Sequence, residues 1–225
     1  MGVLGNLIPA FLFTKAETGI SSSLTGMLNS LTPVFTLFLG VVLFKTKTKW
    51  VNALGIFIGF AGAIGLLTVG KSSDLGNNML FGLFVVVATV CYGLSVNIIK
   101  VELDNVKPIA ATVWAMTFIG PMAGIYLFGC TDFVVKFNTQ PGAYVSLGYV
   151  SLLAIFGTAI SVIIFNMLIR NTTALFASSV TYLIPIVAMG WGFLDGENLQ
   201  VLHFLWIAII LAGVFLVNKK PQTAK

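Results

Sequence analysis

The chain has 225 residues, of which 58% are hydrophobic and 8% are charged, with a formal net charge of +5. Soluble domains usually carry about 25% charged residues, so this composition excludes a water-soluble protein and indicates an integral membrane protein. The twelve Lys and Arg residues lie singly or in short groups between apolar segments, without the interleaved basic and aromatic residues of a nucleic-acid groove, so we expect no nucleic-acid partner.

Eight apolar segments follow one another along the chain, most of them close to the roughly 20 residues that a helix needs to cross the hydrocarbon core. Their apolar residues do not alternate with period two, which argues against transmembrane strands. We therefore predict an all-α polytopic bundle of about eight transmembrane helices in the inner or plasma membrane. The predicted spans are residues 2–17, 20–44, 50–69, 78–99, 108–130, 143–168, 173–194 and 200–217.

The segments between the spans carry most of the polar residues. When they are assigned alternately to the two sides of the bilayer, nine Lys and Arg residues fall on one side and three on the other. The richer side includes 45–49, Lys100, Lys107 and Arg170 together with the tail 219–225. Because loops rich in Lys and Arg stay in the cytoplasm, we expect the C-terminus on the cytoplasmic side. The apolar spans make the lipid bilayer the expected partner.

The chain contains an internal repeat, visible when it is shifted by 152 residues. This shift places Pro33 over Pro185 and brings two pairs of glycines into register, and one residue of drift in the next loop brings Gly62 over Gly213. The aligned pairs are Gly5 with Gly157, Ile8 with Ile160, Phe13 with Phe165, Leu31 with Leu183 and Gly40 with Gly192. The repeat predicts one unit over 1–70 and a second over 78–218, and such duplication is typical of secondary transporters.

The two units differ in charge and in length. The basic "KTKTK" follows span 20–44, whereas the acidic "DGEN" follows its counterpart 173–194, and Lys45 lies opposite Glu197. This reversal predicts that the units are inverted across the membrane. The second unit has five spans and the first has three, so we expect that two helices are missing before Met1 and that the chain is a fragment.

These residues resemble the EamA family of the drug/metabolite transporter superfamily. The resemblance lies in "ISSSLTGMLNSLTPVFTLFLGVVLF" with "WVNALGIFIGFAGAIGLL", and again in "ALFASSVTYLIPIVAMGWGFLDGENL" with "FLWIAIILAGVFLV". It implies ten helices in two inverted five-helix units that move small metabolites or drugs. The sequence departs from the family pattern at Lys45, where an exit glutamate is common, and in the first two helices.

Pro33 and Pro185 are predicted to kink their helices, and each affects the residue four positions before it. Proline lacks an N–H and clashes with the carbonyl four residues earlier, so the carbonyls of Asn29 and Thr181 are freed. In lipid such a carbonyl must face protein or water, which makes the two positions candidates for lining a substrate cavity. The alternative is a packing kink that a neighbouring helix satisfies.

Other polar or aromatic side chains share helical faces with these positions. Any one of them could instead bond its own backbone or join two helices. The mid-span aromatics Tyr92 and Trp114 suit a cavity better than lipid, and Ser95 follows Tyr92 by one turn. The remaining substrate-binding candidates are Ser30, Thr158, Ser161, Ser178 and Tyr182, with Asn6 as the repeat counterpart of Thr158.

Two stripes of small residues permit close helix approach. Gly55, Gly59 and Ala63 form one stripe, and Gly120 and Gly124 form the other. Packing within one chain is the favoured reading of both, with a homodimer face as the alternative.

Charged residues lie near the predicted span ends, where Glu17, Glu197 and Lys15 read as interfacial anchors. We expect no catalytic residue, metal site or cofactor, and therefore no enzyme. The sequence favours a permease or exporter that moves a small neutral or zwitterionic metabolite or drug by alternating access. The alternative is a non-transporting scaffold or an inactive truncated remnant.

Overall fold

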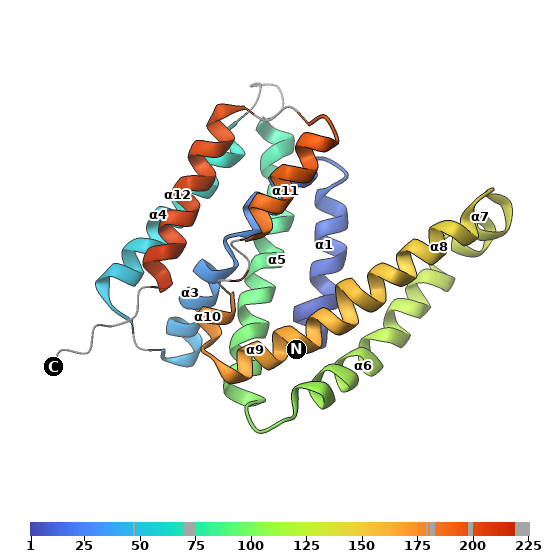
Figure 1. Cartoon of the computed structure of the whole chain (residues 1–225), viewed down its shortest axis with the longest axis horizontal. Helices are drawn as coiled ribbons and strands as arrows, with labels where there is room; N and C mark the ends of the chain where they lie inside the picture. The colour runs from blue at the N-terminus through green and yellow to red at the C-terminus, as the bar shows by residue number, and fades with distance from the viewer. Residues whose placement is uncertain (47, 70–74, 179, 181–182, 198–199, 219–225) are drawn as a thin grey trace.

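The fold was obtained as a computed structural model, which describes the chain except residues 47, 70–74, 179, 181–182, 198–199 and 219–225. The described residues form helices joined by short connections, without strands (Figure 1). In chain order the helices are η1 (Val3–Leu7), α1 (Ile8–Ala16), α2 (Ser22–Asn29), α3 (Thr32–Phe44), α4 (Trp50–Leu67), α5 (Leu75–Glu102), α6 (Pro108–Gly129), α7 (Phe133–Thr139), α8 (Ala143–Leu152), η2 (Leu153–Ile160), α9 (Ser161–Asn171), α10 (Ala174–Ser178), α11 (Leu183–Leu194) and α12 (Val201–Asn218).

The helices confirm the predicted all-α membrane bundle. Among the described residues, five helical segments are long and apolar enough to cross a bilayer: Ser22–Phe44, Trp50–Leu67, Met79–Glu102, Pro108–Gly129 and Ala143–Asn171. Three shorter apolar helical segments, Val3–Ala16, Leu183–Leu194 and Val201–Val217, complete the series. Each falls within or overlaps one of the eight spans expected from the sequence. Large apolar side chains cover the outside of the bundle, as a lipid solvent requires.

The two prolines start new helices where kinks within single helices were expected. Helix α2 ends at Asn29, and α3 begins at Thr32 with Pro33 in its first turn. A proline is well tolerated there because the amide hydrogens of a first turn have no partner within the helix. Pro185 stands in the same way near the start of α11, after α10. Each unit therefore has a broken helix at the same repeat position.

Glycines allow α4 and α12 to pack backbone against backbone. A Cβ atom on Gly213 would lie 2.5 Å from the amide nitrogen of Gly59 and 2.8 Å from the carbonyl oxygen of Gly55. At one end of this seam the buried amide of Asn52 donates to the carbonyls of Leu216 (3.1 Å) and Val217 (2.6 Å). The first small-residue stripe thus packs within the chain, as favoured above.

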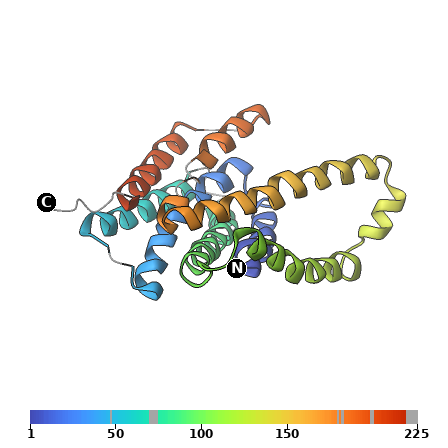
Figure 2. The same cartoon turned by 60° about the horizontal axis from the view of Figure 1, so that its bottom comes forward.

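The second stripe has a different environment. Apart from the neighbouring backbone of α6 itself, no described atom lies within 4 Å of a Cβ built on Gly120 or Gly124. Helices α6 and the continuous rod α8–η2–α9 leave the bundle obliquely and are joined by α7 at their far end (Figure 1). They meet near α9, where Asn166 Nδ2 donates to Thr112 Oγ1 at 2.8 Å, and they splay apart toward α7 (Figure 2). A dimer through α6 stays a prediction.

Helix α5 passes along α1 and α3 and is fixed to both. The buried side-chain amide of Asn97 donates to the carbonyl of Gly93 on its own helix (2.8 Å) and to that of Thr36 on α3 (2.9 Å). Gly93 lies against the Thr36 backbone, where a Cβ would be 2.8 Å from the amide nitrogen. The broken helix is therefore held against α5 one turn after Pro33.

The α4–α12 seam leads to a prediction about stability. Replacing Gly213 by Ala places a methyl group against backbone atoms that cannot rotate away, so we expect a loss of about 1–3 kcal/mol. Gly120→Ala is the matched control, and its higher helix propensity should leave stability unchanged or slightly raised. Thermal unfolding in detergent, followed by tryptophan fluorescence, measures both. Equal midpoints for the two variants would contradict the packing described.

Candidate functional site

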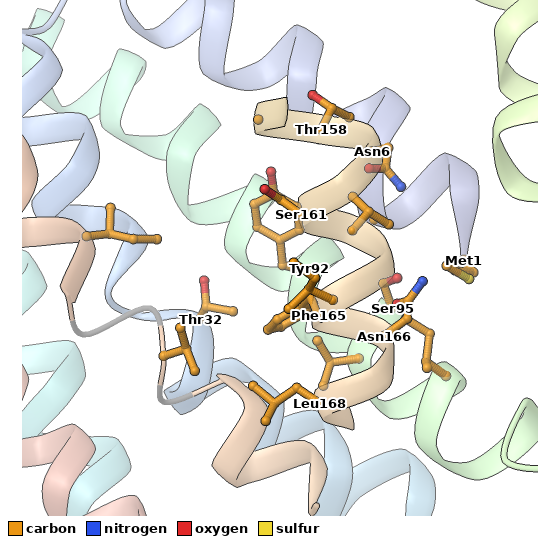
Figure 3. Close-up of a pocket in the computed structure, with 18 of the residues that line it drawn as sticks. Met1, Asn6, Thr32, Tyr92, Ser95, Thr158, Ser161, Phe165, Asn166 and Leu168 are labelled. Atoms are coloured by element: carbon orange, nitrogen blue, oxygen red, sulfur yellow. The ribbon is translucent and has the colours of Figure 1, made fainter. Parts of the chain in front are cut away.

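A cavity of about 560 Å³ lies beside α5, between the N-terminal turn η1 and the rod η2–α9. Asn29 and Thr32 at the α2–α3 break, with Val180 and Ile184, line its remaining side; Figure 3 shows Thr32 there. Its uncharged polar lining comes from both units: Asn6, Asn29, Thr32, Tyr92, Ser95, Thr158, Ser161 and Asn166. Its apolar lining includes Val96, Ile99, Val162, Phe165, Leu168 and Ile184.

Four of the predicted substrate-binding residues meet in this cavity. Asn29, Tyr92, Thr158 and Ser161 all line it, although they come from helices far apart in the sequence. The ring of Tyr92 also packs against that of Phe13 in α1, with 5.9 Å between the two ring centroids. Figure 3 shows Tyr92 and Ser161 facing the same space from opposite helices.

The other candidates lie elsewhere. Ser30 is fully buried and donates its hydroxyl to the carbonyl of Met27, so it satisfies its own helix end. Trp114 is 63% exposed on the outer face of α6, stacked on Phe118, and does not line this cavity. Ser178 ends α10, but its side chain is outside the described residues, as are Thr181 and Tyr182.

The carbonyl freed by Pro33 has a partner. Thr32 Oγ1 donates to the main-chain oxygen of Asn29 at 2.8 Å and lies 3.2 Å from its side-chain oxygen. A bare oxygen was expected at this position, and a hydroxyl from the next helix caps it. Both residues line the cavity, so the break presents the Asn29 amide together with the Thr32 hydroxyl.

Two wide helical turns lie at equivalent positions of the repeat, and both line the cavity. The π-helical turns η1 and η2 include Gly5 and Gly157, which the 152-residue shift superimposes. In the second turn Ser161 Oγ donates to the carbonyl five residues earlier, that of Phe156, at 2.8 Å. Such turns occur frequently at functional sites because they widen the backbone and rotate the residues that follow.

Three further polar lining residues, Asn6, Ser95 and Asn166, carry only weak signals in the sequence. Ser95 and Asn6 share a helical face or a repeat position with candidates, so the spacing could have ranked them higher. Asn166 is 2% exposed and bonds to Thr112 of α6, a contact between distant segments that spacing alone does not reveal.

A carboxylate joins the two units at the other end of α2. Glu197 Oε1 accepts from the amide of Ser22 at 3.1 Å, and Oε2 accepts from that of Ser23 at 3.3 Å. These amides belong to the first turn of α2, whose positive dipole end favours a negative charge. The Ser23 hydroxyl also donates to the carbonyl of Ala188 in α11 at 3.2 Å. We call these contacts the Glu197 clamp; an interfacial anchor was expected at this residue.

Next to the Glu197 clamp, helices α2 and α11 pack closely against each other. A Cβ on Gly26 would lie 2.3 Å from Cβ of Ala188, and one on Gly192 would overlap the Ser23 hydroxyl. Leu24, Met27 and Leu28 bury the adjoining face of α2. This end of the α2–α11 pair is dry and tightly packed, whereas the cavity occupies the opposite end of α2.

Curated proteins with similar sequences are named as transporters. The chain is 28% identical over 214 residues to the uncharacterized inner membrane transporter YedA of Escherichia coli K12, covering 92% of this chain and 65% of YedA. It is 27% identical to the uncharacterized transporter sll0355 of Synechocystis, covering 97% of this chain and 69% of that protein. It is 23% identical to the uncharacterized transporter YyaM of Bacillus subtilis, covering 97% and 70%. These names describe transporters and not enzymes.

The fold also matches a solved protein. A crystal structure with 13% sequence identity superimposes with a TM-score of 0.60, covering 96% of this chain and 74% of that one, which supports the helical architecture alone. The EamA-like transporter family matches residues 1–68 and 79–219, which is nearly the whole chain. The apolar helices, the paired helix breaks around a polar cavity and this match lead to one conclusion: the chain belongs to the EamA-like transporter family and is an integral membrane protein.

Proposed function

We propose that this protein is a secondary transporter that moves a small neutral or zwitterionic metabolite or drug by alternating access around the cavity. The observation that carries the proposal is the composition of the cavity wall. The α2–α3 break and the wide turns of both units place uncharged hydrogen-bonding groups around one space. The chain spans 65% of the length of YedA. Transport activity of this chain is therefore proposed here and is not taken from that relative.

The pairing of helices supports a twofold relation between the units, which an inverted repeat requires. If α2–α3 and α10–α11 are equivalent, exchanging them turns the α2–α11 contact into the α10–α3 contact, and both contacts are present. The same exchange maps the α4–α12 seam onto itself. A twofold axis in the membrane plane, as in other transporters with inverted repeats, would produce this pattern.

The cavity suits a modest, uncharged cargo. Its volume of about 560 Å³ falls within the range of roughly 300–1,000 Å³ for small-ligand sites. The described lining side chains are apolar or neutral and polar, with hydroxyl and amide groups that can both donate and accept. A phosphorylated cargo would need a cation, which the described lining side chains do not supply.

The orientation inferred from the basic loops suggests which end is open. The lining runs from Tyr92 and Ser161 in mid-span toward Ile99 and Leu168, which precede the basic residues Lys100 and Arg170. These ends belong to the side assigned to the cytoplasm. The Glu197 clamp lies at the opposite side, so the described conformation would be open inward and closed outward.

Water access separates transport from the scaffold alternative. In a background with Cys91→Ala and Cys130→Ala, we expect a water-soluble thiol reagent to label Ser161→Cys and Asn29→Cys. Phe118→Cys, on the outer face of α6, is the control that should stay unlabelled because lipid covers it. Mass spectrometry of the labelled chain measures the reaction. A scaffold with dry polar faces would leave all three positions unreacted.

Transport itself is tested in reconstituted vesicles loaded with radiolabelled neutral amino acids or an uncharged drug. For any compound that crosses, Tyr92→Phe should lower kcat/KM roughly ten-fold, since a buried hydrogen bond to the cargo is lost. Tyr149→Phe is the matched control, because this tyrosine is 70% exposed on α8. Flux no faster than in empty vesicles, or equal effects of the two variants, would count against transport.

The Glu197 clamp leads to a separate expectation. Glu197→Gln removes the charge that favours the α2 helix end, so the outward-open state should become roughly two- to five-fold more populated. Labelling of Ser161→Cys by a membrane-impermeant reagent from the non-cytoplasmic side should rise by the same factor. Asp195→Asn, in the same connection but exposed, should have no effect. An identical labelling rate in both variants would exclude a gating role for the clamp.

A further inference from the structure

A second hollow, of about 730 Å³, lies where the start of α6 crosses the end of α9, apart from the cavity described above. Its wall consists of Lys107, Pro108, Ile109, Ala110, Val113 and Trp114 from α6 with Met167, Arg170 and Asn171 from α9. We call this hollow the α6–α9 groove. It shares no lining residue with the transport cavity.

The groove has two chemically different parts. Its side walls are apolar and face outward: Ile109 is 58% exposed, Val113 54% and Met167 46%. At the helix ends stand two cations, Lys107 just before α6 and Arg170 in the last turn of α9. An apolar trough that ends in two positive charges is complementary to an amphiphile with an anionic head.

The cations of the groove are not neutralised by the acidic residues nearby. Asp104 lies 3.8 Å from Lys100, whose ammonium also donates to the carbonyl of Arg170 at 3.1 Å. Glu102 is exposed in the same connection. Within the described part of the chain, neither Lys107 nor the Arg170 side chain takes part in a salt bridge. Both are therefore available to a ligand.

We propose that the α6–α9 groove binds an anionic glycerophospholipid. Its phosphate lies between Lys107 and Arg170, and an acyl chain runs along Ile109, Val113 and Met167. Basic pockets between membrane helices on the cytoplasmic side bind such headgroups, and the basic-loop assignment puts this end of both helices on that side. Trp114, about 9 Å along α6 from Pro108, stands at the depth where tryptophan anchors proteins at the interface.

The test uses the fluorescence of Trp114, taken as the difference between the wild-type chain and Trp114→Phe in phosphatidylcholine vesicles. Brominated phosphatidylglycerol, a contact quencher, replaces increasing fractions of the lipid, and brominated phosphatidylcholine serves as the neutral reference. We expect phosphatidylglycerol to be preferred roughly 25-fold at Trp114, because each of the two basic residues near the lipid headgroup contributes roughly five-fold. Equal quenching by the two brominated lipids would overturn the proposal.

Charge variants locate the effect. Lys107→Gln together with Arg170→Gln should abolish the preference, whereas Lys45→Gln together with Lys136→Gln, which changes net charge equally outside the groove, should keep it. A preference that survives the groove variant, or is lost in the control, would also overturn the proposal. All these side chains are exposed, so unchanged circular dichroism and thermal unfolding should show that each variant folds.

The source of the phosphate is tested separately. Millimolar glycerol 3-phosphate or inorganic phosphate, added to vesicles with brominated phosphatidylglycerol, should not restore Trp114 fluorescence, since neither offers an acyl chain to the trough. Restoration would show that a soluble phosphate compound fills the site, and it would contradict a lipid occupant. None of these measurements depends on transport, so the lipid site and the proposed function can fail independently.

Discussion

Every polar group of a backbone inside a bilayer must find its partner within the protein, because hydrocarbon offers none. This constraint accounts for the arrangement around Pro33. The proline ends one helix and starts another, and the hydroxyl of Thr32 bonds to the carbonyl that the break releases on Asn29. A broken helix is stable here only because it is surrounded by protein or by the cavity. The same requirement explains why the polar cavity and the broken helices coincide.

Packing divides the bundle into a rigid part and a polar part. The α4–α12 seam has backbone contacts that no side chain could relieve, and the amide of Asn52 closes its end. Asn97 holds the broken helix to α5 in a similar way, through two buried bonds to carbonyl oxygens. The cavity lies beside α5, among hydroxyls, amides and wide turns. A transporter needs both parts. Tightly packed helices can move as a unit, and a cavity lining of hydroxyls and amides can exchange its hydrogen bonds between cargo and water.

The helices and much of the cavity were predictable from the sequence because lipid imposes simple rules. The long apolar runs predict the transmembrane spans. The matching prolines predict the helix breaks, and from the first break we predicted that Asn29 lines a cavity. Helical spacing from the repeat then reached Thr158 and Ser161. Helical spacing shows which residues share a face of a helix, but it does not show what that face packs against. Predictions that needed this information failed. Trp114 was expected to line the cavity with Tyr92, yet its ring is exposed on α6, a helix that inclines away from the bundle (Figure 2). Ser30 neighbours Asn29 but satisfies its own helix end.

Glu197 shows a second limit of sequence reasoning. Its position at a span end suggested an anchor in the headgroup region, and nothing in its neighbours indicated that α2, about 175 residues earlier, presents two free amides to it. The π-helical turns were equally invisible, since no residue type marks them. Such features arise from contacts between distant segments, and a single sequence records those contacts only where a repeat or a motif happens to coincide with them.

The charge reversal between Lys45 and Glu197 has a thermodynamic consequence. Two identical halves related by an inversion would give inward and outward conformations of equal free energy. Among the described residues, the carboxylate of Glu197 accepts from the first amides of α2, whereas at the start of α10 the amide of Phe176 donates to the hydroxyl of Thr173. A difference of about 1 kcal/mol, typical for a carboxylate at a helix end, would skew the two populations roughly five-fold before any cargo binds. Without cargo, the protein would therefore favour one of its two conformations because of its own sequence.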